Sequence, residues 1–344
     1  MNTKRNFLIE KINYDSTLDS TLDSTPDSTS NNNDNRSILF LKLAKKYGIK
    51  IVYDYTMYMF NHNVDLWCLW FKRLGINTDI VSFGDVKNDD PCMLIAHYYI
   101  SCPNKCCLVI QTENFVTITH NKCGYTNINT TAALKTMNEA YVVWDYSSAN
   151  IAILREKYTI KNIFRVPVMF SDNSTLFKDI NLNDPQYYIN EDWLQIDTSR
   201  PIDVIISAHT PRRYKIACDL ADKKLKWQSI NRSEIPTIIL KCKVFLNLHA
   251  YDEISALELH RLLDIRNVPI VIVSEASADI DSQEQLNGIP FVKYDELVDI
   301  CYRLCTDKDL WMKYLDKQMN MWKNINVIEA LEQCLPLVED ALVL

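Results

Sequence analysis

Apolar and polar positions in this chain follow two rhythms, one typical of buried strands and one typical of amphipathic helices. In the first half, short apolar runs are separated by segments whose apolar residues recur at helical spacing. The clearest such segment, Val64–Ile76, is rich in tryptophan and leucine and ends near Gly75. Further helices are predicted near Thr130–Asn138 and Ser148–Lys157. The strand-like runs of this half are Ile49–Tyr55, Asp89–Ile100, Lys105–Phe115, Ala140–Ser147 and Asn162–Phe170.

The alternation resumes after a polar stretch rich in Asn and Asp. Helices are predicted at Arg212–Lys224, at Ser255–Arg266 and toward the C-terminus. Strands that alternate with helices indicate parallel sheets with crossover connections. We therefore expect an α/β fold of two doubly wound domains that face each other across a deep cleft. The strand-like runs of this half are Ile202–His209, Lys243–Ala250, Val268–Glu275 and Ile289–Asp295.

Changes in composition and hydrophobic pattern along the chain suggest the domain boundaries. Residues 1–37 include a tandem Asp-Ser-Thr repeat and an Asn run with almost nothing to bury, so we expect a disordered tail. The first domain should cover 38–170, and 171–200 should connect it to a second domain at 201–308. The C-terminal helices at 309–344 are candidates for packing back on the first domain.

Length and charge narrow the class of protein. A chain of 344 residues with 47% hydrophobic residues suits two soluble globular domains. The net charge of -7 gives no broad basic field, so we expect no nucleic-acid partner. Eleven cysteines in no framework spacing indicate reduced thiols and a cytoplasmic protein. No window approaches the roughly 20 apolar residues of a transmembrane segment, so none is expected.

Common cofactor motifs are absent. Only five glycines occur, and none forms a dinucleotide-binding or P-loop pattern. One cluster raises the hypothesis of a zinc site: Cys102, Cys106 and Cys107, together with His120 and Cys123. These cysteines lack the paired C-x-x-C spacing of structural zinc sites, so we expect no metal site.

Polar side chains follow three apolar strands of the second domain. Ligands of open α/β sheets bind outside the carboxyl ends of the strands, where helix N-termini also converge and favour an anion. One such strand ending is common by chance, but three in one domain are less so. We therefore expect an anion-binding crevice lined by Ser207, His209, Asn247, His249, Ser274 and Glu275.

Two adjacent arginines, Arg212 and Arg213, stand at the start of the helix that follows the first of these strands. Guanidinium groups there suit a bidentate grip on a diphosphate. The alternative is that both are solvated residues at a helix start, where cations are mildly disfavoured by the dipole.

A carboxylate and an arginine, Glu258 and Arg261, lie three residues apart on the next predicted helix. Glu258 could instead complete a capping box with Ser255, and Arg261 could simply pair with Glu258 on the helix surface. His209 and His249 could likewise be hydrogen-bonded histidines at the edge of the core. The combination nevertheless fits a nucleotide, with the arginines on its diphosphate and Glu258 on its ribose hydroxyls.

These residues resemble a pattern of GT-B-type glycosyltransferases, a group with many members in large DNA viruses and microbes. The pattern appears here as Leu246, Asn247, His249, Leu257, Glu258, Arg261, Val273, Ser274 and Glu275. The segments "DVIISAHTPRR" and "AYVVWDYSSANIAIL" are similar to two further segments of the same group. The resemblance covers most of the chain from Asp89 to Asp307.

The resemblance implies two Rossmann-like domains and a sugar transferred from a nucleoside-diphosphate sugar of UDP or GDP type. The C-terminal domain would hold this donor, and a carbohydrate, glycan or protein acceptor would approach from the other domain. No obligatory metal is implied. The sequence departs from the family at Ala208, where glycine is common, and at Ala250, where a second glutamate is common. A non-catalytic GT-B-like nucleotide-sugar-binding or scaffold protein is therefore the alternative.

Glycosyl transfer with inversion requires a base for the acceptor hydroxyl. The candidates are Glu113 and His97, near the ends of first-domain strands, followed by His209. Tyr146 and Asn150 are candidate acceptor or hinge contacts. A third interpretation, a receiver-like or other small-molecule α/β protein, would leave Arg212 and Glu258 without a role in nucleotide affinity.

Overall fold

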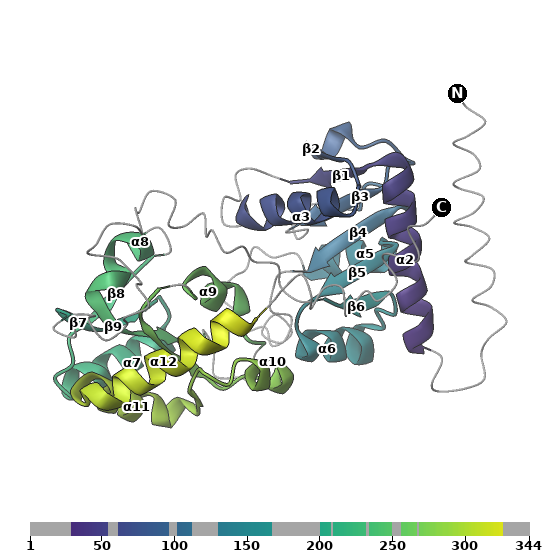
Figure 1. The fold of residues 1–344 in the computed structure, drawn as a ribbon. Helices are drawn as coiled ribbons and strands as arrows, with labels where there is room; N and C mark the ends of the chain where they lie inside the picture. The colour runs from purple at the N-terminus through teal and green to yellow at the C-terminus, as the bar shows by residue number, and fades with distance from the viewer. Residues whose placement is uncertain are drawn as a thin grey trace.

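The computed structural model contains two parallel β-sheets, each flanked by helices (Figure 1). The expected α/β class with parallel sheets is confirmed. No helix in the part of the chain that the structure describes is long and apolar enough to span a membrane. The structure describes residues 29–53, 61–95, 102–111, 130–166, 200–207, 209–231, 234–249, 256–266 and 268–325.

The first sheet has the strand order β2-β1-β3-β4-β5-β6, with every neighbouring pair parallel. Side chains alternate between its two faces, and each face is buried in a separate hydrophobic core. Burial on both faces explains why the central strands are almost uniformly apolar. The strands are β1 Ile49–Val52, β2 Thr78–Val81, β3 Cys92–Ile95, β4 Cys107–Gln111, β5 Val142–Asp145 and β6 Ile163–Arg165.

Helices cover both faces of this sheet. Helices α2 (Thr29–Tyr47) and α3 (Asn61–Arg73) pack on one face, where Trp67 of α3 lies against Trp144 of β5. Helices α5 (Thr130–Glu139) and α6 (Ser148–Tyr158) pack on the other. A short 3-10 turn, Phe83–Asp85, precedes β3.

Helix α2 corrects one expectation from the sequence. It begins at Thr29, inside the stretch predicted to be a disordered tail, so that prediction is wrong for 29–37. A tertiary contact accounts for the difference. The Trp144 Nε1–H donates a hydrogen bond of 3.0 Å to the hydroxyl of Ser37, which is fully buried. The helix ends where Gly48 adopts a left-handed conformation, with φ of 78°.

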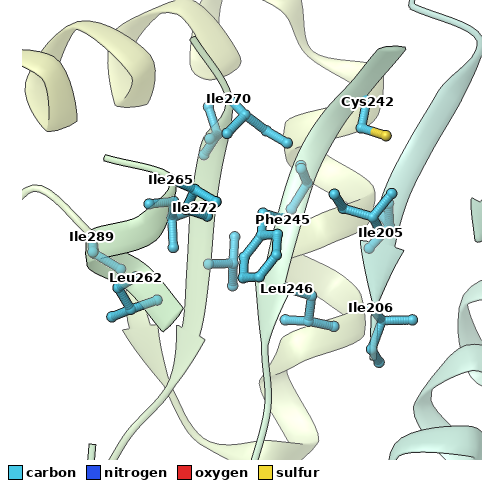
Figure 2. Packing of buried hydrophobic residues seen from close by; sticks show 14 of the residues in the cluster. Ile205, Ile206, Cys242, Phe245, Leu246, Leu262, Ile265, Ile270, Ile272 and Ile289 are labelled. Atoms are coloured by element: carbon cyan, nitrogen blue, oxygen red, sulfur yellow. The ribbon is translucent and has the colours of Figure 1, made fainter. Parts of the chain in front are cut away.

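The second sheet has the strand order β11-β10-β9-β7-β8, again parallel throughout. Phe245 of β9 lies between its register partners, Ile205 of β7 and Ile272 of β10, in the core of this domain (Figure 2). The strands are β7 Ile202–Ile206, β8 Trp227–Ser229, β9 Cys242–Asn247, β10 Val271–Glu275 and β11 Phe291–Val292.

The last helix, α12 (Lys308–Asn324), packs on this second sheet rather than back on the first domain. Strand β11 pairs only with the end of β10, and the buried amide of Gln318 completes the backbone hydrogen bonding of Ile272. Gly288 allows the close approach, because a Cβ there would lie 3.0 Å from Lys317 O. Ile325, just beyond the helix, also packs against the core of the first sheet, and residues 326–344 of the predicted C-terminal helices lie outside the described residues.

The remaining helices of this domain flank the sheet. They are α7 Pro211–Asp222, α8 Ile235–Ile238, α9 Leu259–Asp264, α10 Ile280–Gln285 and α11 Leu297–Thr306, with 3-10 turns at Ile239–Lys241 and Tyr294–Glu296.

Candidate functional site

The strand order brings the predicted polar strand ends together. Strand β7 lies between β8, which follows it in the chain, and β9, so the direction of winding changes between β7 and β9. The carboxyl ends of parallel strands at such a switch point form the usual ligand crevice of open α/β sheets. Helix α7 begins just beyond β7, with Thr210 as its N-cap and Pro211 in its first turn.

Arg212 is part of the framework of this edge. Its guanidinium makes a two-pronged ion pair with Glu275 at the end of β10, with one contact of 2.7 Å, and it also donates to the His249 carbonyl. The guanidinium lies 3.9 Å above the ring of Tyr294, whose hydroxyl donates to the Arg212 carbonyl. Arg212 therefore joins α7 to the ends of β9 and β10.

Arg213 is still more buried, with 7% of its side chain exposed. It donates to the carbonyls of Leu248 and Ser207, at 2.9 and 3.4 Å, and to a carboxylate oxygen of Glu258 at 3.3 Å. This side chain holds the ends of β7 and β9 together and orients Glu258. The alternative of two solvated arginines at a helix start is therefore wrong.

Glu258 lies between two arginines, Arg213 and Arg261. Burial favours a higher pKa for Glu258, but the charges of Arg261 and Arg213 outweigh it and lower the pKa. Glu258 is therefore ionised at neutral pH. Helix α9 begins only at Leu259, so Glu258 is its N-cap and makes no capping bond. Glu258 is therefore not at the third helical position that a capping box requires, and Ser255 lies outside the described residues, whereas the local pair with Arg261 is present.

Two predicted donor contacts, Asn247 and Ser274, are fully buried. The Asn247 amide donates to the Ser274 hydroxyl across β9 and β10 at 3.0 Å, and its oxygen accepts from Arg261 at 3.0 Å. Their direct effect in this structure is to hold Arg261 in place.

His249 has one ring nitrogen without a described partner. Its Nε2 is 3.1 Å from the Ala276 carbonyl, so Nε2 carries the proton and Nδ1 is an acceptor. Its backbone N–H donates to Glu275. Among the described residues nothing hydrogen-bonds to Nδ1, although the side chain is buried. A buried polar atom of this kind is expected to have a partner, so it marks a place where a ligand group could bind.

Charge and exposure distinguish the residues of this cluster. Three arginines, Arg212, Arg213 and Arg261, face two carboxylates, which leaves one surplus positive charge. The Arg261 and Glu258 side chains are 29% and 25% exposed, whereas the Arg212–Glu275 pair is 10% and 9% exposed. Arg261 and Glu258 are therefore the charged groups of the cluster that a ligand can reach most easily.

Of the three candidate bases, the structure describes His209 but not His97 or Glu113. His209 is exposed, three residues beyond the end of β7. Strand β3 ends at Ile95 and β4 at Gln111, and His97 and Glu113 lie just beyond them, outside the described residues.

Tyr146 and Asn150 lie near contacts between elements of the first sheet and elements of the second. Tyr146 follows β5 of the first sheet, but its ring is part of the core of the second domain, and its hydroxyl donates to the Leu257 carbonyl at 3.2 Å. Asn150 is buried in the first turn of α6. Tyr146 thus connects the first domain to Leu257, the neighbour of Glu258.

The sequence analysis missed the central residue of this junction, Asp279. Its buried carboxylate accepts hydrogen bonds from Ser147 Oγ at 2.8 Å, from the Ala149 N–H at 3.0 Å and from the Leu257 N–H at 2.7 Å. Asp279 thereby joins the first turn of α6 to the segment that carries Glu258. An aspartate in the loop after β10 gave no local signal of these distant partners.

A second carboxylate near the junction, Asp145, is fully buried at the end of β5. Burial raises the pKa of Asp145 to about 8, against hydrogen bonds from Ser147 and Asn150, and the charge of Asp279 adds to the increase. Within the described ranges nothing hydrogen-bonds to its Oδ2. Asp145 is therefore largely protonated at neutral pH.

Among the described residues, no group of three or more His, Cys, Asp or Glu side chains has an arrangement that could hold a metal ion. His120 and Cys123, two members of the zinc pattern in the sequence, lie outside those residues.

Comparison with known proteins gives distant likenesses, and no family model matches the sequence. An uncharacterized protein of Acanthamoeba polyphaga mimivirus is 27% identical over 216 residues, which are 61% of this chain and 68% of that protein. The DNA-modifying enzyme beta-glucosyltransferase of phage T4 has a TM-score of 0.49 at 13% identity, covering 86% of this chain and 99% of the enzyme. Its complex with the substrate UDP-glucose has a TM-score of 0.46 at the same identity and coverage. At these values neither likeness assigns a function to this chain.

Proposed function

We propose that this protein is a glycosyltransferase that moves a sugar from a nucleoside-diphosphate sugar to a carbohydrate, glycan or protein acceptor. One observation carries the proposal. At the switch point of the second sheet, Arg213 and Arg261 hold the ionised Glu258, beside the buried His249 whose Nδ1 has no described partner. Such a cluster suits a ligand with both anionic and hydroxyl groups.

The donor would use the accessible side of the cluster. Arg261, with Arg213 behind it, would bind the diphosphate, and Glu258 would accept hydrogen bonds from the ribose hydroxyls. His249 Nδ1 would accept from a further hydroxyl of the donor. Arg212, Glu275, Asn247 and Ser274 would keep these groups oriented, and Ser207 would contribute its backbone carbonyl, which accepts from Arg213.

The remaining parts of the proposal concern the first domain. Glu113 or His97, ahead of His209, would deprotonate the acceptor, and Tyr146 and Asn150 would contact the acceptor or the hinge between two GT-B-like domains. Because arginines supply positive charge to the diphosphate, no metal is required for that purpose. We place the enzyme in the cytoplasm, of the host cell if it is viral.

The test is a donor screen followed by a turnover assay. Thermal shift with UDP-sugars, GDP-sugars and their free nucleotides would identify the donor, and release of nucleoside diphosphate would report transfer or hydrolysis. Acceptors should include oligosaccharides, glycoprotein and duplex DNA. Turnover that is lost in Glu113→Gln or His97→Gln supports the assignment of the base.

The departures at Ala208 and Ala250 favour one competing function, a non-catalytic nucleotide-sugar-binding protein. It predicts donor binding without release of nucleotide in any acceptor mixture. Absence of nucleotide binding would contradict both functions. The matched control is Lys215→Ala, which removes an exposed cation of α7 paired with Asp219 and should leave nucleotide binding unchanged.

A further inference from the structure

Three cysteines converge at the amino ends of β3 and β4 in the first sheet. Cys92 begins β3 and Cys107 begins β4, and the two are register partners in the parallel ladder. Both are fully buried in the same core, on the face that α5 and α6 cover. Cys102, in the turn that leads into β4, is only partly buried and packs against that core.

Asn104 fixes the geometry of this group. The Cys102 thiol donates to the Asn104 carbonyl at 3.0 Å, and the Cys92 thiol lies 3.6 Å from its side-chain oxygen. The amide of Asn104 in turn donates to the carbonyls of Lys87 and Asp90, at 2.9 and 2.8 Å. The turn is therefore held in a defined conformation against the two strands. The Cys107 thiol belongs to the same core as Cys92 and lies beside the sulfur of Cys102, with the Leu108 carbonyl 3.7 Å away.

The structure separates these three thiols from their sequence neighbour Cys106. Cys106 points to the opposite face of the sheet and belongs to the other core. Burial raises the pKa of its thiol to about 12. The adjacent cysteines of the zinc pattern therefore cannot act together, whereas Cys102 meets Cys107 and Cys92.

The two thiols of the Cys102–Cys107 contact differ in character. The hydrogen bond from Cys107 lowers the pKa of Cys102, which is also the more accessible sulfur. Burial, together with the hydrogen bond to Cys102, raises the pKa of Cys107 well above its ordinary value. An accessible thiol with a lowered pKa next to a shielded thiol with a raised pKa is the arrangement of an attacking and a resolving cysteine.

We propose that Cys102 and Cys107 form a reversible disulfide when the protein encounters a peroxide. The Cys102 sulfur attacks the peroxide O–O bond and becomes a sulfenic acid, while the second oxygen leaves as water after protonation. The Cys107 sulfur then displaces the hydroxyl group, which forms the S–S bond and releases a second water. Two thiols are oxidised by two electrons and the peroxide is reduced by two. A small thiol reverses the reaction by disulfide exchange.

The experiment treats the reduced full-length protein with hydrogen peroxide and maps disulfides by non-reducing peptide mass spectrometry. The expected product links Cys102 to Cys107 and disappears with dithiothreitol. In Cys107→Ala, Cys102 should remain as a sulfenic acid that dimedone traps. In Cys102→Ser, peroxide consumption should fall by about tenfold or more, because the accessible thiol of lowered pKa is lost.

The matched control is Cys218→Ser, which removes an exposed cysteine and should leave both the rate and the product unchanged. Circular dichroism checks that each variant is folded, and the dimedone adduct on the wild type gives a readout that needs no variant. The proposal is overturned if Cys218 is oxidised while Cys102 stays reduced. It is also overturned if Cys102 is linked to a cysteine other than Cys107.

Discussion

Arg212 and Glu275 form a bidentate ion pair in which both side chains are about nine-tenths buried. The pair connects the start of α7 to the end of β10, across the intervening end of β9. It also leaves Arg212 with little freedom to turn toward a ligand. Arg212, one of the two adjacent arginines that the sequence suggested for a diphosphate, is thus better explained as a structural support.

The first prediction separates this support from ligand binding. Arg212→Ala leaves the buried Glu275 carboxylate without its partner, so the free energy of unfolding should fall by about 3–5 kcal/mol. Arg261→Ala, at the more exposed position, should cost less than about 1 kcal/mol. Urea denaturation of both variants measures the difference, and equal losses would contradict the distinction.

The second prediction concerns Glu258. Glu258→Gln removes the charge but keeps the size, so ribose hydroxyls lose a charged acceptor worth about 1.5–3 kcal/mol. Affinity for a nucleoside diphosphate should fall by about tenfold or more. A dideoxyribose analogue is the matched ligand: it should bind the wild type and Glu258→Gln equally. If the wild type and Glu258→Gln discriminate equally between the ribose and dideoxyribose ligands, Glu258 does not contact the ribose.

The third prediction uses His249 Nδ1, which has no hydrogen-bond partner in the part of the chain that the structure describes. Because Nε2 donates to Ala276, Nδ1 can only accept from a ligand while the ring is neutral. His249→Phe should lower affinity for the sugar nucleotide by about 3–10-fold, the value of one hydrogen bond of about 0.5–1.5 kcal/mol. The free nucleotide shows which part of the donor Nδ1 contacts. If His249→Phe binds the free nucleotide as tightly as the wild type does, the contact is to the sugar. No change for either ligand would remove His249 from the site.

The fourth prediction is a pH dependence from Asp145. Its pKa is about 8 in the folded protein, above the unfolded value of about 3.9. The folded state therefore binds more protons between these values, and stability decreases as pH rises from about 4 to about 8. Asp145→Asn should lack this decrease. The free energy of unfolding of the variant, relative to that of the wild type, should therefore increase with pH by on the order of several kcal/mol. Unfolding curves from pH 5 to pH 9 measure it, and a constant difference would contradict the raised pKa.

The fifth prediction tests the junction between the domains. Ser147 and Asp279 lie 132 positions apart in sequence, and their hydrogen bond is fully buried. A double-mutant cycle with Ser147→Ala and Asp279→Asn should give a coupling of about 0.5–3 kcal/mol. The pair Lys135→Ala and Glu139→Gln, exposed on α5, is the control and should couple by less than about 0.5 kcal/mol. Coupling no greater than in the control would mean that the junction does not stabilise the fold.

The sequence predicted the parts of the structure whose signal is local. Apolar runs identified the central strands, and the polar residues at the ends of β7, β9 and β10 lie at one edge of the sheet. The edge strands β2 and β8 were missed because neither is a buried apolar run: Thr78–Val81 has exposed positions and Trp227–Ser229 is short and polar. Their pairing with β1 and β7 supplies the stability that their composition does not indicate.

The missing parts depend on partners that are distant in sequence. A Ser- and Asn-rich stretch has low helix propensity, yet α2 includes it because Ser37 is buried beneath Trp144. The roles of Arg212 and Asp279 likewise follow from contacts across the fold, with Glu275 and with Ser147. Composition predicted charged residues at the site but could not show which of them neutralise one another.

The central claim, that the cluster around Glu258 binds a nucleoside diphosphate, is tested most directly by calorimetry. UDP and GDP would be titrated into the wild type, Arg261→Ala and the control Lys215→Ala. We expect one of the two to bind the wild type, about tenfold weaker or more binding to Arg261→Ala because a charged hydrogen bond of about 1.5–3 kcal/mol is lost, and unchanged binding to Lys215→Ala. No binding of either nucleotide to the wild type, or equal affinity in Arg261→Ala, would contradict the claim.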